Sequence, residues 1–271
     1  MLGKLLKNEM KATGRTLWPI YIGILLFAFI NRFFAMNSSY DNTVLYTLFE
    51  RISAVAYGFL LFGLVLVSII IIVQRFYKNL LGDEGYLMFT LPVKTSQLIF
   101  SKIIAATCWI FISTIVAEIS SLIILADWSS FVEFFRLLGI NWHEIVAYST
   151  ELFGVPFWLA VIEFLAIAII STFSGLLMIY AAISFGHLFK KHRLLAAFIG
   201  FFIFSILMTF VIIFLFTIPA VLETFETLVY SESPGGIVQA VMVFLLLYSS
   251  VFGVLYYFIT HRVLNRKLNL E

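Results

Sequence analysis

Six long apolar stretches follow one another along the chain, and the shorter segments between them hold most of the charge. A membrane-spanning helix needs about 20 mainly apolar residues. Backbone groups in lipid must pair within their own segment, so continuous apolar runs predict helices, whereas the alternating segments of a membrane barrel are absent. The pattern predicts an all-α integral membrane protein with one transmembrane domain over residues 1–271. Its six predicted spans cover residues 17–35, 54–73, 98–125, 157–185, 194–221 and 237–259.

The composition agrees with this pattern. Hydrophobic residues make up 62% of the chain and charged residues 12%, against about 45–50% and 25% in soluble domains. A net charge of +2 excludes the strongly basic footprint of a nucleic-acid-binding protein. The single cysteine, Cys108, excludes an intramolecular disulfide and a cysteine metal cluster.

The basic residues predict the orientation. Of the 17 lysine and arginine residues, 13 lie in the N-terminal segment, between spans two and three, between spans four and five, or in the C-terminal segment, and a fourteenth, Lys102, lies at the start of span three. The positive-inside rule therefore predicts a multi-pass protein of the cytoplasmic (plasma) membrane with both termini in the cytoplasm.

Two segments outside the spans have helical patterns. Residues 1–15 place leucines on one face and lysines largely elsewhere, which predicts an interfacial helix along the inner leaflet; the alternative is a basic flank that only fixes the topology. Residues 126–156 predict an external helical segment in two pieces, either re-entrant or on the membrane surface. Trp128 and Trp142 favour interfacial anchoring there over ligand stacking.

The segment between spans two and three, residues 75–97, is too apolar for a solvated loop, and Gly82, Gly85 and Pro92 divide it into short elements. An apolar segment on the cytoplasmic side suggests a docking element for a soluble partner. The alternative is a loop that folds back onto its own helices or onto the lipid headgroups.

The sequence GDEGYLMFTLPV from Gly82, followed by Ser101 and Lys102, resembles permeases of the ATP-binding-cassette (ABC) type-2 exporter family, which is common in Clostridia-like Gram-positive bacteria. The resemblance implies the type-2 exporter permease architecture: an N-terminal interfacial helix, six spans, and a coupling loop at residues 75–97 that docks on an ATPase. It also implies two copies of an ABC ATPase subunit, which carry ATP and magnesium, and a second permease chain, the same or a sister. The implied ATPase-coupling residues are Leu80, Leu81, Gly82, Asp83, Glu84, Gly85, Tyr86, Leu87 and Phe89.

The chain contains no G-x-x-x-x-G-K-[ST] phosphate loop, so ATP hydrolysis is expected on the partner, and this chain is expected to be neither an enzyme by itself nor the holder of a cofactor or metal. His143 and Glu144 begin an H-E-x-x-H zinc motif, but Ala147 stands at the second histidine position. The expected function is outward movement of an apolar or amphipathic substrate: a peptide, a drug or a lipid. The alternative is a non-transporting immunity or sensor protein that binds a peptide or a partner.

Glu118 and Glu163 are the ionisable residues deep in the apolar runs. A charge at the centre of a span costs about 2.5 kcal/mol or more on insertion scales, so each is expected to face the protein interior or water, or to be protonated. Both are candidates for a substrate or gating role. The alternative is a structural group that reaches toward the nearer membrane surface.

Overall fold

The computed structural model describes residues 2–38, 44–81, 85, 93–125, 128–189, 191–219, 223, 227 and 234–266. Over these residues the regular structure is entirely helical. Six of the helices are long and apolar enough to cross a membrane, which confirms the prediction of an all-α chain with six spans. They are α1 (Leu2–Ser38), α2 (Val44–Phe76), α4 (Thr95–Leu125), α7 (Phe157–Gly186), α8 (Arg193–Thr217) and α10 (Pro234–Arg266).

Three shorter helices complete the described structure: η1 (Tyr77–Leu81), a π-helical turn that follows α2, α5 (Trp128–Ile140) and α6 (Trp142–Phe153). The last two are the two helical pieces that the sequence predicts between spans three and four. α6 ends at Gly154, whose φ of 67° lies in the left-handed region. A Cβ on Gly235 would lie only 2.5 Å from the Gly154 Cα, so two glycines let the start of α10 approach the end of α6 closely.

Several helices are longer than the predicted spans, such as α2 and α10, and two of the differences change the predicted segments outside the spans. α1 runs without a break for 37 residues through Pro19, so the predicted interfacial segment 1–15 is the first part of α1. Proline is tolerated within membrane helices because neighbouring groups satisfy the freed backbone carbonyl. α4 begins at Thr95, so it includes the last residues of the segment predicted as a loop.

The chain forms two compact units, and α4 passes from one to the other between Ile99 and Phe100. The first unit consists of Met1–Phe76 and Phe100–Phe135, and the second of Tyr77–Ile99 and Arg136–Glu271.

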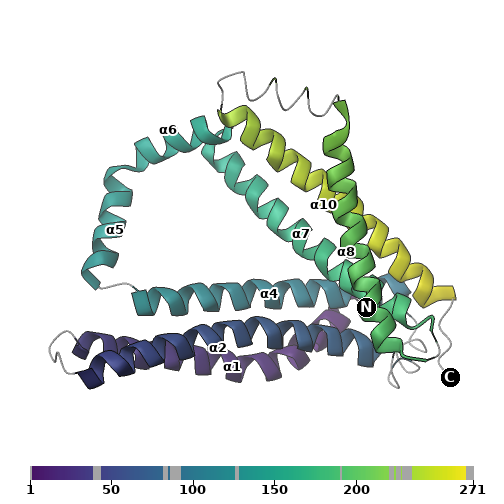
Figure 1. Cartoon of the computed structure of the whole chain (residues 1–271), viewed down its shortest axis with the longest axis horizontal. Coiled ribbons are helices and arrows are strands. Elements are labelled where there is room, and N and C mark those ends of the chain that lie inside the picture. Colours follow the sequence, from purple (N-terminus) through teal and green to yellow (C-terminus); the bar gives the residue numbers. More distant parts are fainter. Residues whose placement is uncertain are drawn as a thin grey trace. The chain divides into compact units, whose positions relative to one another are not determined.

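The first unit is built on a bundle of α1, α2 and α4, which lie side by side (Figure 1). Contacts between α1 and α4 join residues that are 93, 92 and 92 positions apart along the chain. This constant offset means that α1 and α4 run parallel and in register, whereas α2 is antiparallel to both. The core contains Leu17, Tyr21, Ile24, Ala28, Tyr57, Leu64 and Trp109.

In the second unit, α7 packs against both α8 and α10, as can be followed in Figure 1. Small residues permit the close approaches: Gly253 of α10 faces Ser174 of α7, and Gly186 of α7 faces Ala197 of α8. Small residues thus allow close packing of α7 on its neighbours at these two places. By contrast, a Cβ on Gly58 or Gly63 of α2 would meet nothing within 4 Å.

Large apolar side chains cover the outside of both units. Phe59 on α2 and Leu194 on α8 are each 72% exposed, and exposed phenylalanines, leucines and isoleucines continue along these helices. A water-soluble protein does not present apolar surface on this scale. Lipid is therefore the solvent of these helix faces.

Candidate functional site

A buried ionic cluster joins the three helices of the first unit at the two ends of the 75–97 segment. The Nζ of Lys102, on α4, donates to the Oε1 of Glu9 at 2.7 Å. The Nε of Arg75, at the end of α2, donates to the Oε2 of the same carboxylate at 3.1 Å. One carboxylate of α1 thus holds the last turn of α2 and the early part of α4.

This cluster is shielded from solvent. The side chains of Glu9 and Lys102 are 9% and 4% exposed, and that of Arg75 is 24% exposed. Charges in such a place cost several kcal/mol each to desolvate, and they are retained only when they are paired with good geometry. Both cations contact the two oxygens of the same Glu9 carboxylate, so Glu9 connects α2 and α4 in this cluster.

Sequence reasoning missed Glu9. The signal was present, because Glu9 is the only acidic residue among the first 40 and lies between Lys7 and Lys11. Seen on its own, the segment reads as a basic surface helix. The continuous α1 instead turns Glu9 into the bundle.

From Tyr77 onward, the described residues of the 75–97 segment belong to the second unit. Leu80 and Leu81 of η1 are buried, and the ring of Tyr77 lies 5.1 Å from the ring of His187. At the other end of the segment, the Thr95 hydroxyl donates to the Asn265 side-chain carbonyl near the end of α10. The flanks of the segment therefore have fixed partners in each unit.

Of the predicted coupling residues, Leu80, Leu81 and Gly85 are described, and all three are buried. The remaining predicted coupling residues, Gly82, Asp83, Glu84, Tyr86, Leu87 and Phe89, lie outside the described residues.

Side-chain hydroxyl groups continue the polar contacts along the bundle of the first unit. The Tyr21 hydroxyl lies 2.8 Å from the Ser113 Oγ, which in turn lies 3.3 Å from the Ser68 Oγ. The Tyr57 hydroxyl lies 2.6 Å from the Ser120 Oγ. Such bonds between membrane helices contribute about 0.6 kcal/mol on average and up to about 1.7 kcal/mol, so they fix the register of the helices more than they add stability.

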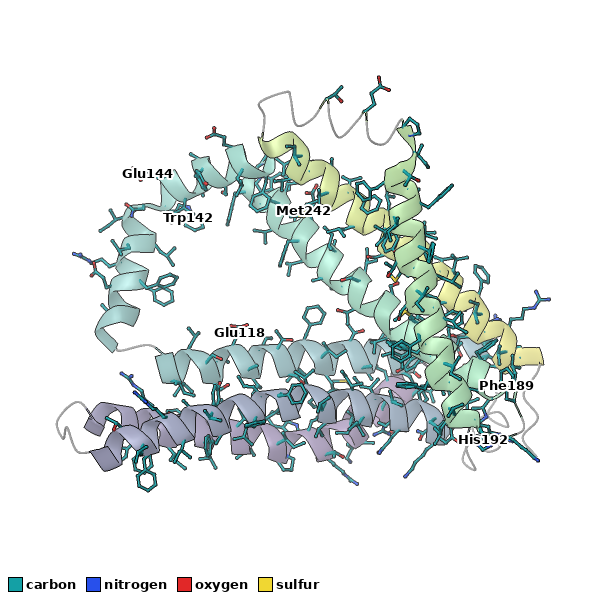
Figure 2. All side chains as sticks on the ribbon, in the orientation of Figure 1. Glu118, Trp142, Glu144, Phe189, His192 and Met242 are labelled. Atoms are coloured by element: carbon teal, nitrogen blue, oxygen red, sulfur yellow. The ribbon has the colours of Figure 1, made fainter. Side chains whose placement is uncertain are left out.

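The two intramembrane glutamates have different surroundings. Figure 2 shows Glu118 projecting from the side of α4 that faces away from α1 and α2, and its side chain is exposed. Glu163 of α7 faces α10, where its Oε1 accepts a hydrogen bond from the Gln239 Nε2 at 2.9 Å. The structure therefore gives Glu163 a protein partner, and Gln239 is a residue that sequence reasoning missed.

One further titratable group lies at the end of α7. His187 is half-buried against Tyr77, and its Nε2 has no hydrogen-bond partner among the described residues. Burial lowers the pKa of His187 below its ordinary value of 6.5, and the nearby Arg193 cation lowers it further. Among the residues that the structure describes, no group of three histidine, cysteine, aspartate or glutamate side chains converges in a way that could hold a metal ion.

Comparison with known protein families, curated proteins and solved structures gives no match for this chain. Its class therefore follows from its own helices. Six long apolar helices with apolar outer faces define a multi-pass helical membrane protein.

Proposed function

We propose that this protein is the transmembrane subunit of an ATP-driven exporter that moves an apolar or amphipathic substrate, such as a peptide, a drug or a lipid, out of the cell. The observation that supports the proposal best is the anchoring of the 75–97 segment. Arg75 and Lys102 flank it and share the Glu9 carboxylate, while Tyr77 and Thr95 contact residues at the ends of α7 and α10.

A coupling element has to pass movement on to the spans. A flexible loop would absorb the movement of a docked partner, whereas flanks held by buried contacts move together with the helices to which they belong. The buried Leu80 and Leu81 and the ionic contacts of Glu9 provide such attachment on both sides of the segment. A partner that binds residues 82–92 would therefore act on the helices of both units.

The energy source in this proposal is a separate chain. This sequence lacks the glycine-rich phosphate loop, whose backbone N–H groups and lysine hold a nucleotide. Two ABC ATPase subunits would bind ATP and magnesium, and two permease chains, identical or sister, would enclose the substrate path. The positive-inside rule predicts that the 75–97 segment and both termini lie in the cytoplasm, where an ATPase could reach them.

Affinity purification tests the proposal. The tagged full chain is isolated from membranes of its native host, co-purified chains are sequenced, and ATP hydrolysis is measured. We expect a chain with a phosphate loop to co-purify, and we expect ATP hydrolysis to increase when the transported compound is added from a panel of apolar peptides, drugs and lipids. Repeated recovery without any nucleotide-binding chain would contradict the exporter function, and peptide binding without ATP hydrolysis would favour an immunity or sensor protein.

A charge-reversal pair tests the coupling segment. The double substitution Asp83→Lys/Glu84→Lys should abolish co-purification of the ATPase. The matched control, Glu144→Lys/Glu151→Lys, reverses two exposed acidic residues of α6 and should leave co-purification unchanged. Equal recovery of the ATPase with both variants would place the docking surface elsewhere.

A further inference from the structure

A carboxylate and an amide meet within the apolar part of the second unit. Glu163 and Gln239 lie about one and a half turns from the starts of α7 and α10, roughly 8 Å along each helix axis. The Gln239 Nε2 donates to the Glu163 Oε1 at 2.9 Å. The other oxygen of each group, Glu163 Oε2 and Gln239 Oε1, is buried and has no hydrogen-bond partner among the described residues.

The donors and acceptors of this pair do not balance. An ionised carboxylate offers two acceptor oxygens and no donor, and a glutamine amide offers one acceptor oxygen and two donor hydrogens. One hydrogen bond therefore leaves two acceptor oxygens facing an apolar environment. Each buried polar atom without a partner costs about 1–3 kcal/mol, and more when it is charged.

A single proton corrects both deficits. When Glu163 carries a proton on Oε2, that oxygen becomes a donor, and the nearest unsatisfied acceptor in the pair is Gln239 Oε1. A carboxylic acid and a primary amide then form two hydrogen bonds in a closed ring. A metal cation fits less well, because sodium-like or calcium-like ions need about six oxygen ligands and the pair offers two.

Apart from His143 of α6, the basic residues on the described helices that pack against α7 lie at the first residue of α8 or in the last turns of α10. α7 packs against α6, α8 and α10. The titratable side chains of α6 are His143, Glu144, Tyr148 and Glu151, and α8 carries only Arg193, at its first residue. The basic residues of α10 are His261, Arg262 and Arg266, at least 22 positions after Gln239 along the same helix.

We propose that Glu163 and Gln239 form a proton-binding site within the membrane-spanning part of the protein. A proton from the aqueous phase forms an O–H bond with Glu163 Oε2, the charge of the side chain changes from −1 to 0, and the new hydroxyl donates to Gln239 Oε1. Proton binding thus adds a second hydrogen bond between α7 and α10 and removes a charge from lipid depth. Its release reverses both effects, so the packing of α7 on α10 responds to protonation.

Infrared difference spectroscopy of the full chain in lipid vesicles tests this proposal. Spectra are recorded for pH steps between neutral and acidic buffer, and the carbonyl stretch of protonated carboxyl groups is compared between variants. We expect Glu163→Gln to lose one protonated-carboxyl component completely. Gln239→Leu should keep that component but shift it to higher frequency, because the acid then lacks its amide partner.

Two controls keep the assignment specific. Glu118→Gln removes the exposed intramembrane carboxyl of the first unit and so identifies the infrared component of Glu118. That component should keep its frequency in Gln239→Leu. Glu163→Gln is isosteric, and its amide can make the same two hydrogen bonds to Gln239, so circular dichroism should show an intact fold.

Three results would overturn the proposal. The first is that Glu163→Gln loses no protonated-carboxyl component at any pH at which the chain stays folded. The second is a component that Gln239→Leu leaves unshifted. The third is a spectral change specific to sodium over potassium that Glu163→Gln abolishes, which would make the pair a cation site.

Discussion

Replacing Glu9 by glutamine removes a negative charge that contacts both Lys102 and Arg75. The substitution keeps the size and shape of the side chain, so it tests the charge and not the packing. Lys102 is 4% exposed and cannot regain water without movement of α4. The prediction is a large loss of stability of the first unit.

The magnitude follows from the geometry. Two unit charges 2.7 Å apart attract by about 6 kcal/mol at an effective dielectric constant of about 20. The desolvation of both charges offsets much of this attraction, and removing one partner of a buried pair costs about 3–5 kcal/mol. Glutamine retains one acceptor oxygen, so we expect a loss of about 3 kcal/mol, which is roughly a hundredfold change in the unfolding equilibrium constant.

Equilibrium unfolding in mixed micelles, followed by helical circular dichroism, measures this loss. The double variant Glu9→Gln/Lys102→Met removes both members of the pair. The double variant no longer has a buried Lys102 charge that lacks the Glu9 carboxylate. The loss of stability in the double variant should therefore be smaller than the sum of the losses in the two single variants, with a coupling energy of about 2 kcal/mol. Glu118→Gln makes the same chemical change at an exposed position of α4, and because Glu118 is 16 positions from Lys102 on the same helix, its effect should add to that of Lys102→Met without coupling.

The reasoning would be refuted by a Glu9→Gln protein that unfolds within about 1 kcal/mol of the wild type. Strictly additive losses in the double variant would refute it equally, because they would mean that Glu9 and Lys102 do not stabilise each other.

Three further predictions concern single residues. Gly14→Ala should destabilise the protein by about 1–3 kcal/mol, because the added Cβ would lie 2.8 Å from the buried ring of Trp109. In the matched control Gly23→Ala, in the same helix, the added Cβ meets nothing within 4 Å, and this substitution should stabilise the protein by about 0.5–1 kcal/mol. Equal effects of the two substitutions in unfolding experiments would contradict the packing described for α1. Tyr57→Phe should cost about 0.6–1.7 kcal/mol in the same unfolding experiment, since it loses its hydroxyl contacts with two serines of α4, and an unchanged stability would argue against these bonds. The pKa of His187 is lowered by burial and by a neighbouring guanidinium, so below about pH 6.5 the unfolded protein binds more protons at this residue than the folded protein does. The contribution of His187 to stability should therefore be full above that pH and should decrease as the pH falls toward the lowered folded pKa. A plot of unfolding temperature against pH should be flatter for His187→Gln.

Much of the fold could be predicted from the sequence. The six spans follow from apolar runs, because the cost of placing a helix in lipid is nearly a sum over its residues. The two short helices α5 and α6 follow from their own periodicity and from the glycine and proline at their ends. When two neighbouring segments both have helical patterns, the sequence does not show whether they form one continuous helix or two. For this reason residues 1–15 were expected as an element separate from the first span.

The candidate site was predictable only in part. The apolar residues of the 75–97 segment marked it as unusual, and Leu80, Leu81 and Gly85 are indeed buried. Burial of these three residues agrees with a segment that folds back onto its own helices, which the sequence left as an alternative. The sequence does not distinguish an apolar segment that is exposed for a partner from one that packs on its own helices, since the two can contain the same residues.

Intramembrane charges show the same limit. Glu118 and Glu163 are equivalent in sequence, because each is an acidic residue inside an apolar run. In the structure Glu118 is exposed on α4, while Glu163 meets Gln239. The difference depends on which face of the helix carries the glutamate and on what the neighbouring helix places opposite it.

By itself, the sequence determined that this chain is helical, that it crosses a membrane six times, and where its apolar helices lie. Each of these properties depends on residues that are close together along the chain. Only the tertiary structure decided that Glu9 joins Arg75 to Lys102 and that Glu163 pairs with Gln239, since these partners are between 66 and 93 positions apart. Pairing over such distances is decided by the register and the facing surfaces of packed helices, and in an apolar interior the cost of an unpaired polar group makes that register specific.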